Sequence, residues 1–301
     1  MKRVLLSGAG GFLARHFAPF LRDRGIEVEL IGRGSRPGVD FTSPEPWVVE
    51  LERFAPDAVL HLAGCMSGAD VSAFYRVNVG FAAALFEAAR RAKLPAENPI
   101  LLLSSAAEIG NAPEGDAPIP ESAPRRPLGH YGVSKAAQTE LGLLEAKARA
   151  VVIARVFNLA GPFMPTTLAL GHFAASIAEV ARKGGRGAIR VGNLSAVRDF
   201  IDARDAVRLC WELLLDPRAR GKVTNVASGR GVRMEDALST LIDVSNCAIS
   251  VELDPARNKP ADVPVSIGST ERLTALLGPL ELMPLRDSLK AAYEAALVTS
   301  H

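Results

Sequence analysis

The chain has 301 residues, 48% of them hydrophobic and 23% charged, with a formal net charge of +2 at pH 7. This length allows a large buried core, and the near-neutral charge gives no reason to expect a nucleic acid or an anionic membrane surface as a partner. No apolar run reaches the roughly 20 residues that span a bilayer, and the start of the chain shows no cleavable leader, so we expect a cytoplasmic protein without a membrane partner.

Short apolar runs alternate with helical patterns in the first half of the chain. The apolar runs predict strands at residues 4–6, 28–31, 58–62, 100–103 and 151–156. The periodic segments between them predict helices at residues 12–24, 81–92 and 134–148. This alternation is typical of an α/β fold with a doubly wound parallel sheet, the Rossmann arrangement. Pro19 lies inside the first helix and predicts a kink or a shorter helix.

The second half has a different pattern. Residues 110–129 contain five prolines, which predict a long ordered loop or lid. After Pro162 we expect a helix at 172–183, a glycine-rich turn at 184–187, a strand at 188–191 and short mixed elements. We therefore predict a Rossmann domain over 1–164, to which 197–228 returns, and a smaller α/β C-terminal region over 165–301.

Cysteine and histidine give no sign of a metal site. Three cysteines and five histidines are scattered along the chain, with no CxxC and no HExxH. We expect reduced thiols and no metal.

The stretch SGAGGFLA, from Ser7 to Ala14, places three glycines between the first strand and the first helix. Glycines at this point let the backbone approach a pyrophosphate, and the helix N-terminus offers unpaired N–H groups to an anion. Ala14 replaces the third glycine of the usual pattern, and we expect its small side chain to be tolerated. A plain tight turn would have the same sequence, but the flanking strand and helix favour a dinucleotide site. The predicted cofactor contacts are Gly8, Gly10, Gly11, Phe12 and Leu13.

The end of the second strand indicates which dinucleotide binds. Sites for NAD usually carry an acidic residue there, which binds the ribose 2′-hydroxyl and would repel a 2′-phosphate. Here the position is Gly32, followed by Arg33 and Arg36. Because arginine binds phosphate well, the sequence favours NADP(H) as cofactor. The alternative, that both arginines are solvated loop charges, stays open.

Tyr131 and Lys135 stand four residues apart at the start of a predicted helix, so their side chains share one face. A nearby ammonium lowers the pKa of a phenol, which suits the tyrosine to proton exchange near neutral pH. Ser104 and Ser105 end an apolar strand at the carboxyl edge of the sheet, where doubly wound proteins bind ligands. We expect a serine there to hydrogen-bond a carbonyl or alcohol oxygen of the substrate.

Six motifs of the chain resemble, in order and spacing, those of the extended short-chain dehydrogenase/reductases that act on nucleotide sugars. They are SGAGGFLA, HLAG, SSAAEIG, YGVSK, ARVFNLAGP and RDFIDARDAV, which together span essentially the whole chain. Within this family the segments VGNLSAVRDFIDARDAV, TNVASGRGV and DPARNKPADVP are most similar to GDP-4-keto-6-deoxy-D-mannose reductases.

The resemblance implies an oxidoreductase that uses NADPH to reduce the C4 ketone of a nucleotide-linked 4-keto-6-deoxyhexose. The expected product is GDP-D-rhamnose or its C4 epimer GDP-6-deoxy-D-talose. The family commonly forms homodimers through two helices per subunit, for which 74–89 and 134–148 are the candidates here; the alternative, that their apolar faces are ordinary core, stays open. Dehydratases of the family carry a carboxylate pair directly after the position of Ser105, where this chain has Ala106 and Ala107. Two alternatives stay open: a nucleotide-sugar 4-epimerase with retained NAD, and a non-catalytic NADP-binding sensor.

Carried over by position, the resemblance assigns roles to individual residues. Tyr131 would protonate the C4 oxygen, Lys135 would hold the nicotinamide ribose and tune the tyrosine, and Ser105 would polarise the C4 carbonyl. Further cofactor contacts would be Asp40, Phe41, Leu62, Ala63 and Gly64.

The resemblance also places substrate contacts. Asn158 would contact the sugar and Arg198 the diphosphate. Lys259 stands where the relatives have arginine in DPARxRP. The full set of predicted substrate contacts is Ser104, Glu108, Asn158, Arg198, Arg257 and Lys259.

Overall fold

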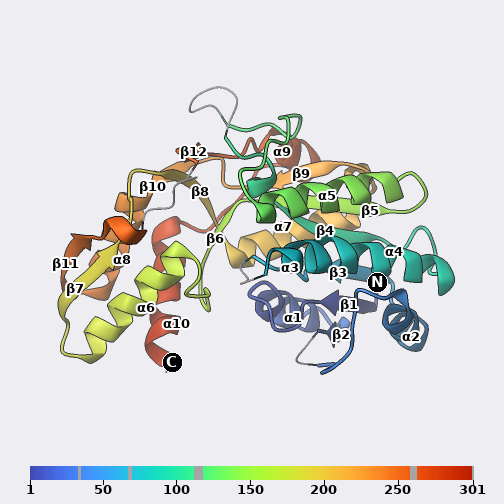
Figure 1. The fold of residues 1–301 in the computed structure, drawn as a ribbon, viewed down its shortest axis with the longest axis horizontal. Helices are drawn as coiled ribbons and strands as arrows, with labels where there is room; N and C mark the ends of the chain where they lie inside the picture. Colours follow the sequence, from blue (N-terminus) through green and yellow to red (C-terminus); the bar gives the residue numbers. More distant parts are fainter. Residues whose placement is uncertain (33–34, 67–69, 112–117, 258–262, 300–301) are drawn as a thin grey trace.

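The computed structural model describes residues 1–32, 35–66, 70–111, 118–257 and 263–299 (Figure 1). At its centre lies a six-stranded sheet of order β2-β1-β3-β4-β5-β9, in which every neighbouring pair is parallel. The strands are β1 (Arg3–Ser7), β2 (Glu27–Ile31), β3 (Ala58–His61), β4 (Ile100–Ser105), β5 (Val151–Val156) and β9 (Val223–Val226). The strand order reverses between β1 and β3, and such a reversal opens a crevice at the carboxyl ends of the strands. The predicted doubly wound sheet is thus confirmed.

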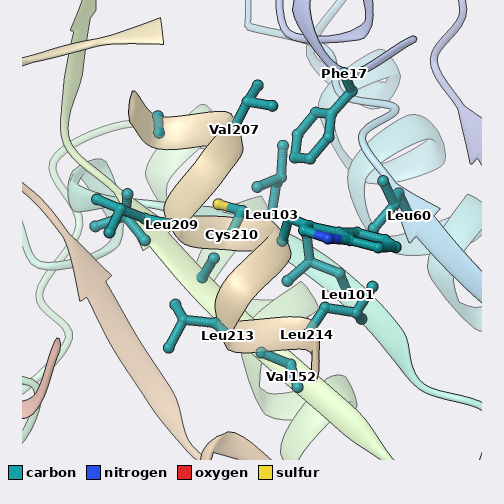
Figure 2. Close-up of a cluster of buried hydrophobic side chains, with 14 of the residues drawn as sticks. Phe17, Leu60, Leu101, Leu103, Val152, Val207, Leu209, Cys210, Leu213 and Leu214 are labelled. Carbon is teal, nitrogen blue, oxygen red and sulfur yellow. The ribbon is translucent and has the colours of Figure 1, made fainter. Parts of the chain in front are cut away.

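Helices cover both faces of this sheet because its strands are apolar on both sides. Val4 and Leu6 of β1 pack with helices α1 (Ala14–Arg22) and α7 (Ala203–Leu215), whereas Leu5 packs on the opposite side. That opposite side is covered by α2 (Pro44–Phe54), α4 (Phe81–Arg91) and α5 (His130–Glu145). Figure 2 shows α7 lying along the first face, with its apolar side chains against those of β3, β4 and β5.

A second group of elements lies at the left of Figure 1. It contains a sheet of order β10-β8-β12 to which β6 adds, and a two-stranded sheet of β7 and β11. Helices α6 (Ala169–Arg182), α8 (Met234–Ser245) and α10 (Leu285–Val298) share a core with β7 and β8. The strands are β6 (Asn158–Ala160), β7 (Arg186–Val191), β8 (Val197–Asp202), β10 (Gly231–Arg233), β11 (Ala248–Leu253) and β12 (Val265–Ser266).

Short helices lie between these elements along the chain. They are α3 (Val71–Tyr75), the π-helix η1 (Arg76–Gly80), the 3-10 turns η2 (Ala106–Glu108), η3 (Pro217–Ala219) and η4 (Pro255–Arg257), and α9 (Glu271–Leu277). Helix α9 places Leu273 in the core of the main sheet, although it falls within the region 165–301 that we expected to be separate. The domain boundaries therefore stay a prediction.

Several local expectations are refined by the structure. The first helix is shorter than expected, begins at Ala14 and contains Pro19. Ala14 is buried in the core, so its place in the glycine motif is ordinary helix packing. Helix α2 was not predicted, because prolines at its start hide its helical pattern. Within the described ranges no helix is long and apolar enough to cross a membrane.

Candidate active site

The glycine loop after β1 has the geometry of a pyrophosphate cradle. Gly8 has φ +80°, and a Cβ there would lie 2.8 Å from the backbone nitrogen of Ala63. Only glycine fits such a position, because left-handed backbone and a close approach of two chains coincide there. Gly10 and Gly11 are exposed, and no side chain caps the N-terminus of α1. The loop therefore leaves backbone N–H groups accessible to an anion.

The predicted contacts around this loop are divided between surface and core. Phe12 and Leu13 are half-buried, Gly64 is exposed, and Ala63 is buried with its N–H donated to the Oγ of Ser7 at 3.3 Å. Leu62 packs against the main core. All five follow the carboxyl ends of β1 and β3, so the structure brings them to one edge of the sheet.

Two further predicted cofactor contacts, Asp40 and Phe41, follow β2 along the chain. Asp40 is exposed and accepts hydrogen bonds from the backbone N–H and the hydroxyl of Thr42, which lower the pKa of its carboxyl. Phe41 is buried, and its ring packs edge-on against Trp47 at 5.0 Å between ring centroids. Phe41 thus acts as a core anchor that holds Asp40 at the surface.

The arginine expected to bind a 2′-phosphate is already paired. Arg36 donates to Glu50 at 2.5 Å and to Glu29 at 2.6 Å, which corrects the expectation of a free phosphate ligand. Carboxylates on β2 and α2 lie close to the loop and compensate the guanidinium charge. Gly32 lies beside the glycine loop, where a Cβ would come within 3.1 Å of the Ala9 nitrogen. Arg33 lies outside the described residues.

Ser105 and Tyr131 meet at the carboxyl end of β4. Ser105 accepts a hydrogen bond from the backbone N–H of Ala107 at 3.2 Å, which orients its side chain at the start of η2. Burial raises the pKa of Tyr131, and a hydrogen bond with Ser105 acts in the opposite direction. We expected the ammonium of Lys135 to lower this pKa; the structure corrects that direction, because loss of hydration outweighs the favourable contacts.

Close packing of α5 against η2 brings the side chains of Ser105 and Tyr131 together. Gly132 follows Tyr131 in the first turn of α5, and a Cβ there would lie 2.4 Å from the carbonyl oxygen of Ala107. Only a residue without a side chain allows this approach. The glycine in YGVSK therefore has a structural reason that the sequence did not reveal.

Lys135 is buried one turn further along α5. Its Nζ donates to the carbonyl oxygen of Leu103 at 2.5 Å and to Oε1 of Gln138 at 2.6 Å. Burial lowers its pKa to about 8, and the negative charge of Glu108 opposes that shift. The ammonium is therefore held in place beneath the carboxyl end of β4.

Two predicted substrate contacts lie in the core instead. Ser104 is 5% exposed and Glu108 fully buried. Glu108 accepts from the Nε of Arg155 at 2.5 Å, from Ser104 at 2.7 Å and from Thr139 at 2.6 Å. Because both oxygens of the carboxylate are occupied by core partners, the expectation that Ser104 and Glu108 touch substrate is wrong for this structure.

The predicted nucleotide-sugar contacts gather where β6 and β8 pair. Asn158 is half-buried and donates to the backbone oxygen of Asp199 at 3.2 Å. Arg198 is partly exposed on β8 and donates to the carbonyl of Val197 at 2.9 Å. Arg257 ends η4, and Lys259 lies outside the described residues.

Asp199 is a buried anchor of this substrate region that the sequence did not single out. Its carboxylate accepts from the N–H and hydroxyl of Ser228 at 2.8 and 2.6 Å, from the N–H of Gly229 at 2.9 Å and from that of Gly268 at 3.1 Å. Burial raises the pKa of the carboxyl, against these hydrogen bonds. One side chain thus joins β8 to two separate loops.

Asn78 also escaped the sequence analysis. It is fully buried in the π-helix η1 and bonds both backbone groups of Cys65, at 2.7 and 3.0 Å, and the hydroxyl of Ser134 at 2.8 Å. It therefore fixes the loop after β3 against α5. An asparagine among apolar residues of a helical pattern was the signal that could have identified it.

No group of acidic, histidine and cysteine side chains suited to a metal occurs in the part of the chain that the structure describes.

Comparison with known proteins gives a consistent result. The model of the family described as "NAD dependent epimerase/dehydratase family" matches residues 4–227. The chain is 27% identical to the GDP-6-deoxy-D-mannose reductase of Pseudomonas aeruginosa, over 96% of this chain and 95% of that protein. It is 28% identical to the UDP-glucose 4-epimerase of Azospirillum brasilense, over 98% and 91% respectively.

The fold also matches a solved structure along its whole length. The structure of RMD from Pseudomonas aeruginosa complexed with NADPH superimposes with a TM-score of 0.86 at 25% identity, covering 99% of this chain and 98% of that one. The similarity therefore includes the C-terminal elements as well as the main sheet.

Proposed function

This chain belongs to the NAD dependent epimerase/dehydratase family, and on that premise we propose that it is an NADPH-dependent reductase of a nucleotide-linked 4-keto-6-deoxyhexose. The observation that carries the proposal is the hydrogen bond between Ser105 and Tyr131 at the carboxyl end of β4, with Lys135 buried against the carbonyl of Leu103 in the same strand; the glycine loop follows β1 at the same edge of the sheet. The relatives are named for nucleotide-linked sugars, and the structural relative was solved with NADPH, which supports the substrate class and the cofactor.

In this proposal each side chain has one task. When bound, the nicotinamide cofactor supplies a hydride. Tyr131 Oη donates a proton to the C4 oxygen of the sugar, and the Ser105 hydroxyl donates a hydrogen bond to the same oxygen, stabilising the negative charge that develops there. Burial raises the phenol pKa, so the tyrosine is protonated before the reaction, and its hydrogen bond with Ser105 favours the phenolate that forms when the proton leaves. Lys135 holds the cofactor ribose.

On the cofactor side, the residues present fit a dinucleotide. Gly8 and the uncapped start of α1 fit its pyrophosphate. Gly32 leaves the end of β2 without the acidic side chain that would repel a 2′-phosphate, which supports NADP(H) although Arg36 is paired elsewhere.

On the substrate side, Asn158 of β6 lies opposite Phe200 of β8 and donates to the carbonyl oxygen of Asp199, the residue after Arg198. We assign Arg198 to the diphosphate and Asn158 to the sugar. The substrate we favour is GDP-4-keto-6-deoxy-D-mannose, reduced to GDP-D-rhamnose or to GDP-6-deoxy-D-talose. A thermal-shift screen of nucleoside diphosphates, with NADPH present, tests the base: GDP should raise the melting temperature most.

The direct test mixes purified protein with NADPH and GDP-4-keto-6-deoxy-D-mannose and follows NADPH absorbance. We expect NADPH to be consumed by the native chain and not by Tyr131→Phe, which keeps the ring and removes the proton donor. No consumption with this or related 4-keto sugars, at high enzyme concentration, would refute the proposal.

A second candidate is a nucleotide-sugar 4-epimerase with retained NAD, which the similarity to UDP-glucose 4-epimerase supports. Protein that purifies with stoichiometric NAD and interconverts C4 epimers without net consumption of NADPH would favour it. A third reading is a non-catalytic NADP-binding sensor; a Tyr131→Phe chain that retains its cellular role would support that reading.

We also propose a cytoplasmic homodimer. Val133 and Leu144 on α5 are 39% and 59% exposed, and a second copy of the chain would cover them. Sedimentation velocity distinguishes a dimer from a monomer.

A further inference from the structure

A buried ion pair lies directly behind the proposed catalytic groups. Glu108 and Arg155 are both inaccessible to solvent, and the Nε of Arg155 lies 2.5 Å from Oε1 of Glu108. Moving two charges out of water costs several kcal/mol, and apolar side chains of similar volume often stabilise a core as well or better. Stability alone therefore does not explain this pair.

The second oxygen of Glu108 joins two elements of the site. Its Oε2 accepts from Ser104 at 2.7 Å and from Thr139 at 2.6 Å. Ser104 lies in β4, next to Ser105, whereas Thr139 lies in α5 about two turns beyond Tyr131, on the same face of the helix. One carboxylate therefore connects the strand that carries Ser105 to the helix that carries Tyr131.

Glu108 is also tied to Ser105 through the backbone. It is the last residue of η2, and the N–H of Ala107 in that turn donates to the Oγ of Ser105. We propose that Glu108 is a positioning residue, which sets the distance between Ser105 and Tyr131 by anchoring η2 and α5 to one point. This inference rests on the proposed function and deepens it.

Arg155, the partner of Glu108, also contacts β9, the edge strand next to β5. Its Nη1 donates to Oδ1 of Asn225 in β9 at 3.2 Å, and Asn225 donates in turn to the carbonyl of Ile119 at 2.8 Å. Among the described residues the Nη2 of Arg155 has no hydrogen-bond partner. Loss of Glu108 would thus leave a buried cation with no carboxylate, which makes a change at Glu108 hazardous for folding.

The charge of Glu108 reaches the catalytic groups as well. Burial is the main cause of the raised pKa of Tyr131, and the charge of Glu108 adds to it; burial lowers the pKa of Lys135, and the same charge opposes that shift. Replacement of Glu108 by glutamine should therefore lower the pKa of Tyr131. The titration thus reports whether the ionised carboxylate acts on Tyr131, and the kinetics of Thr139 variants report its positioning role.

The test uses Thr139→Val, which removes the bond from α5 to Glu108 and leaves the ion pair intact. Because the helix that carries Tyr131 loses its tie to Glu108, we expect kcat for the 4-keto sugar to fall about tenfold, which is about 1.4 kcal/mol of activation free energy, with KM within about twofold. Thr139→Ser restores the hydroxyl and should restore kcat. The matched control is Thr224→Val, because Thr224 is equally buried and its hydroxyl has no partner among the described residues.

A second measurement needs no substrate. The chain has three tyrosines, so subtraction of Tyr131→Phe isolates the ultraviolet titration of Tyr131. We expect Glu108→Gln to lower this pKa relative to the native chain. Should the native chain act on no 4-keto sugar, the proposed function fails while this titration still decides the role of Glu108.

Unchanged kcat in Thr139→Val would overturn the positioning role, as would an unchanged Tyr131 titration in a folded Glu108→Gln. If Glu108→Gln does not fold, the kinetics of Thr139→Val and its serine rescue decide alone.

Discussion

Replacing Gly132 by alanine tests how closely α5 must approach η2. The added Cβ would lie 2.4 Å from the carbonyl oxygen of Ala107 and 2.8 Å from Cβ of Pro127, whereas ordinary contacts begin at 3.4 Å. The first turn of α5 must therefore move by about 1 Å, a displacement that can cost about 100-fold in rate when it separates reacting groups. Since Tyr131 precedes this glycine, we expect kcat/KM for the 4-keto sugar to fall about 100-fold. Overpacking of this kind should also cost about 1–3 kcal/mol of stability.

The assay follows NADPH consumption, together with the melting temperature and NADPH affinity of each variant. The matched control is Gly129→Ala, three residues earlier, where an added Cβ meets nothing within 4 Å and the backbone is extended at φ −157°. We expect that variant to match the native chain. If Gly132→Ala kept kcat/KM within about twofold while remaining folded, the reasoning that places Tyr131 by this contact would be refuted.

Three further outcomes are expected. Burial lowers the pKa of Lys135 to about 8, so its ammonium is present below that pH and lost above it. NADPH affinity, measured by fluorescence, should therefore fall as pH rises through 8. Lys135→Met should abolish this dependence. Arg36→Ala removes ion pairs to Glu29 and Glu50 and should lower the free energy of unfolding in denaturant by about 1 kcal/mol. The preference for NADPH over NADH should stay unchanged. A lost preference would show that Arg36 binds phosphate. Asp199→Ala leaves three backbone N–H groups without their acceptor and should lower the free energy of unfolding by about 3 kcal/mol or more. Because Arg198 is adjacent, GDP should also raise the melting temperature less than in the native chain. Unchanged stability would contradict the anchoring role.

The sequence was most informative where the signal is local. Apolar runs predicted β1 to β5; β1, β3, β4 and β5 are largely buried and need few polar residues, whereas β2 at the edge of the sheet also carries Glu27 and Glu29. Helix α2 escaped prediction, since Pro44 and Pro46 stand in its first turn, where proline is tolerated because the N–H groups there have no partner within the helix. The serine, tyrosine and lysine were predicted from neighbouring residues, and the structure brings them to one strand end.

Charged residues were the least predictable part of the site. Glu108 matched a motif and was expected at the substrate, yet its partner Arg155 lies 47 residues away in a strand that otherwise reads as apolar. Arg36 was expected at a phosphate, but two carboxylates from β2 and α2 hold it. In both cases the sequence reports a charge and not what faces it.

By itself, then, the sequence determined the alternation of strands and helices, the glycine loop and the order of Ser105, Tyr131 and Lys135, because side-chain periodicity and turn chemistry depend on neighbours along the chain. Tertiary structure alone decided which polar groups are buried, that Tyr131 has a raised and Lys135 a lowered pKa, and that one carboxylate joins β4 to α5. Those properties depend on distance and hydration in the folded core, where residues remote in sequence become neighbours.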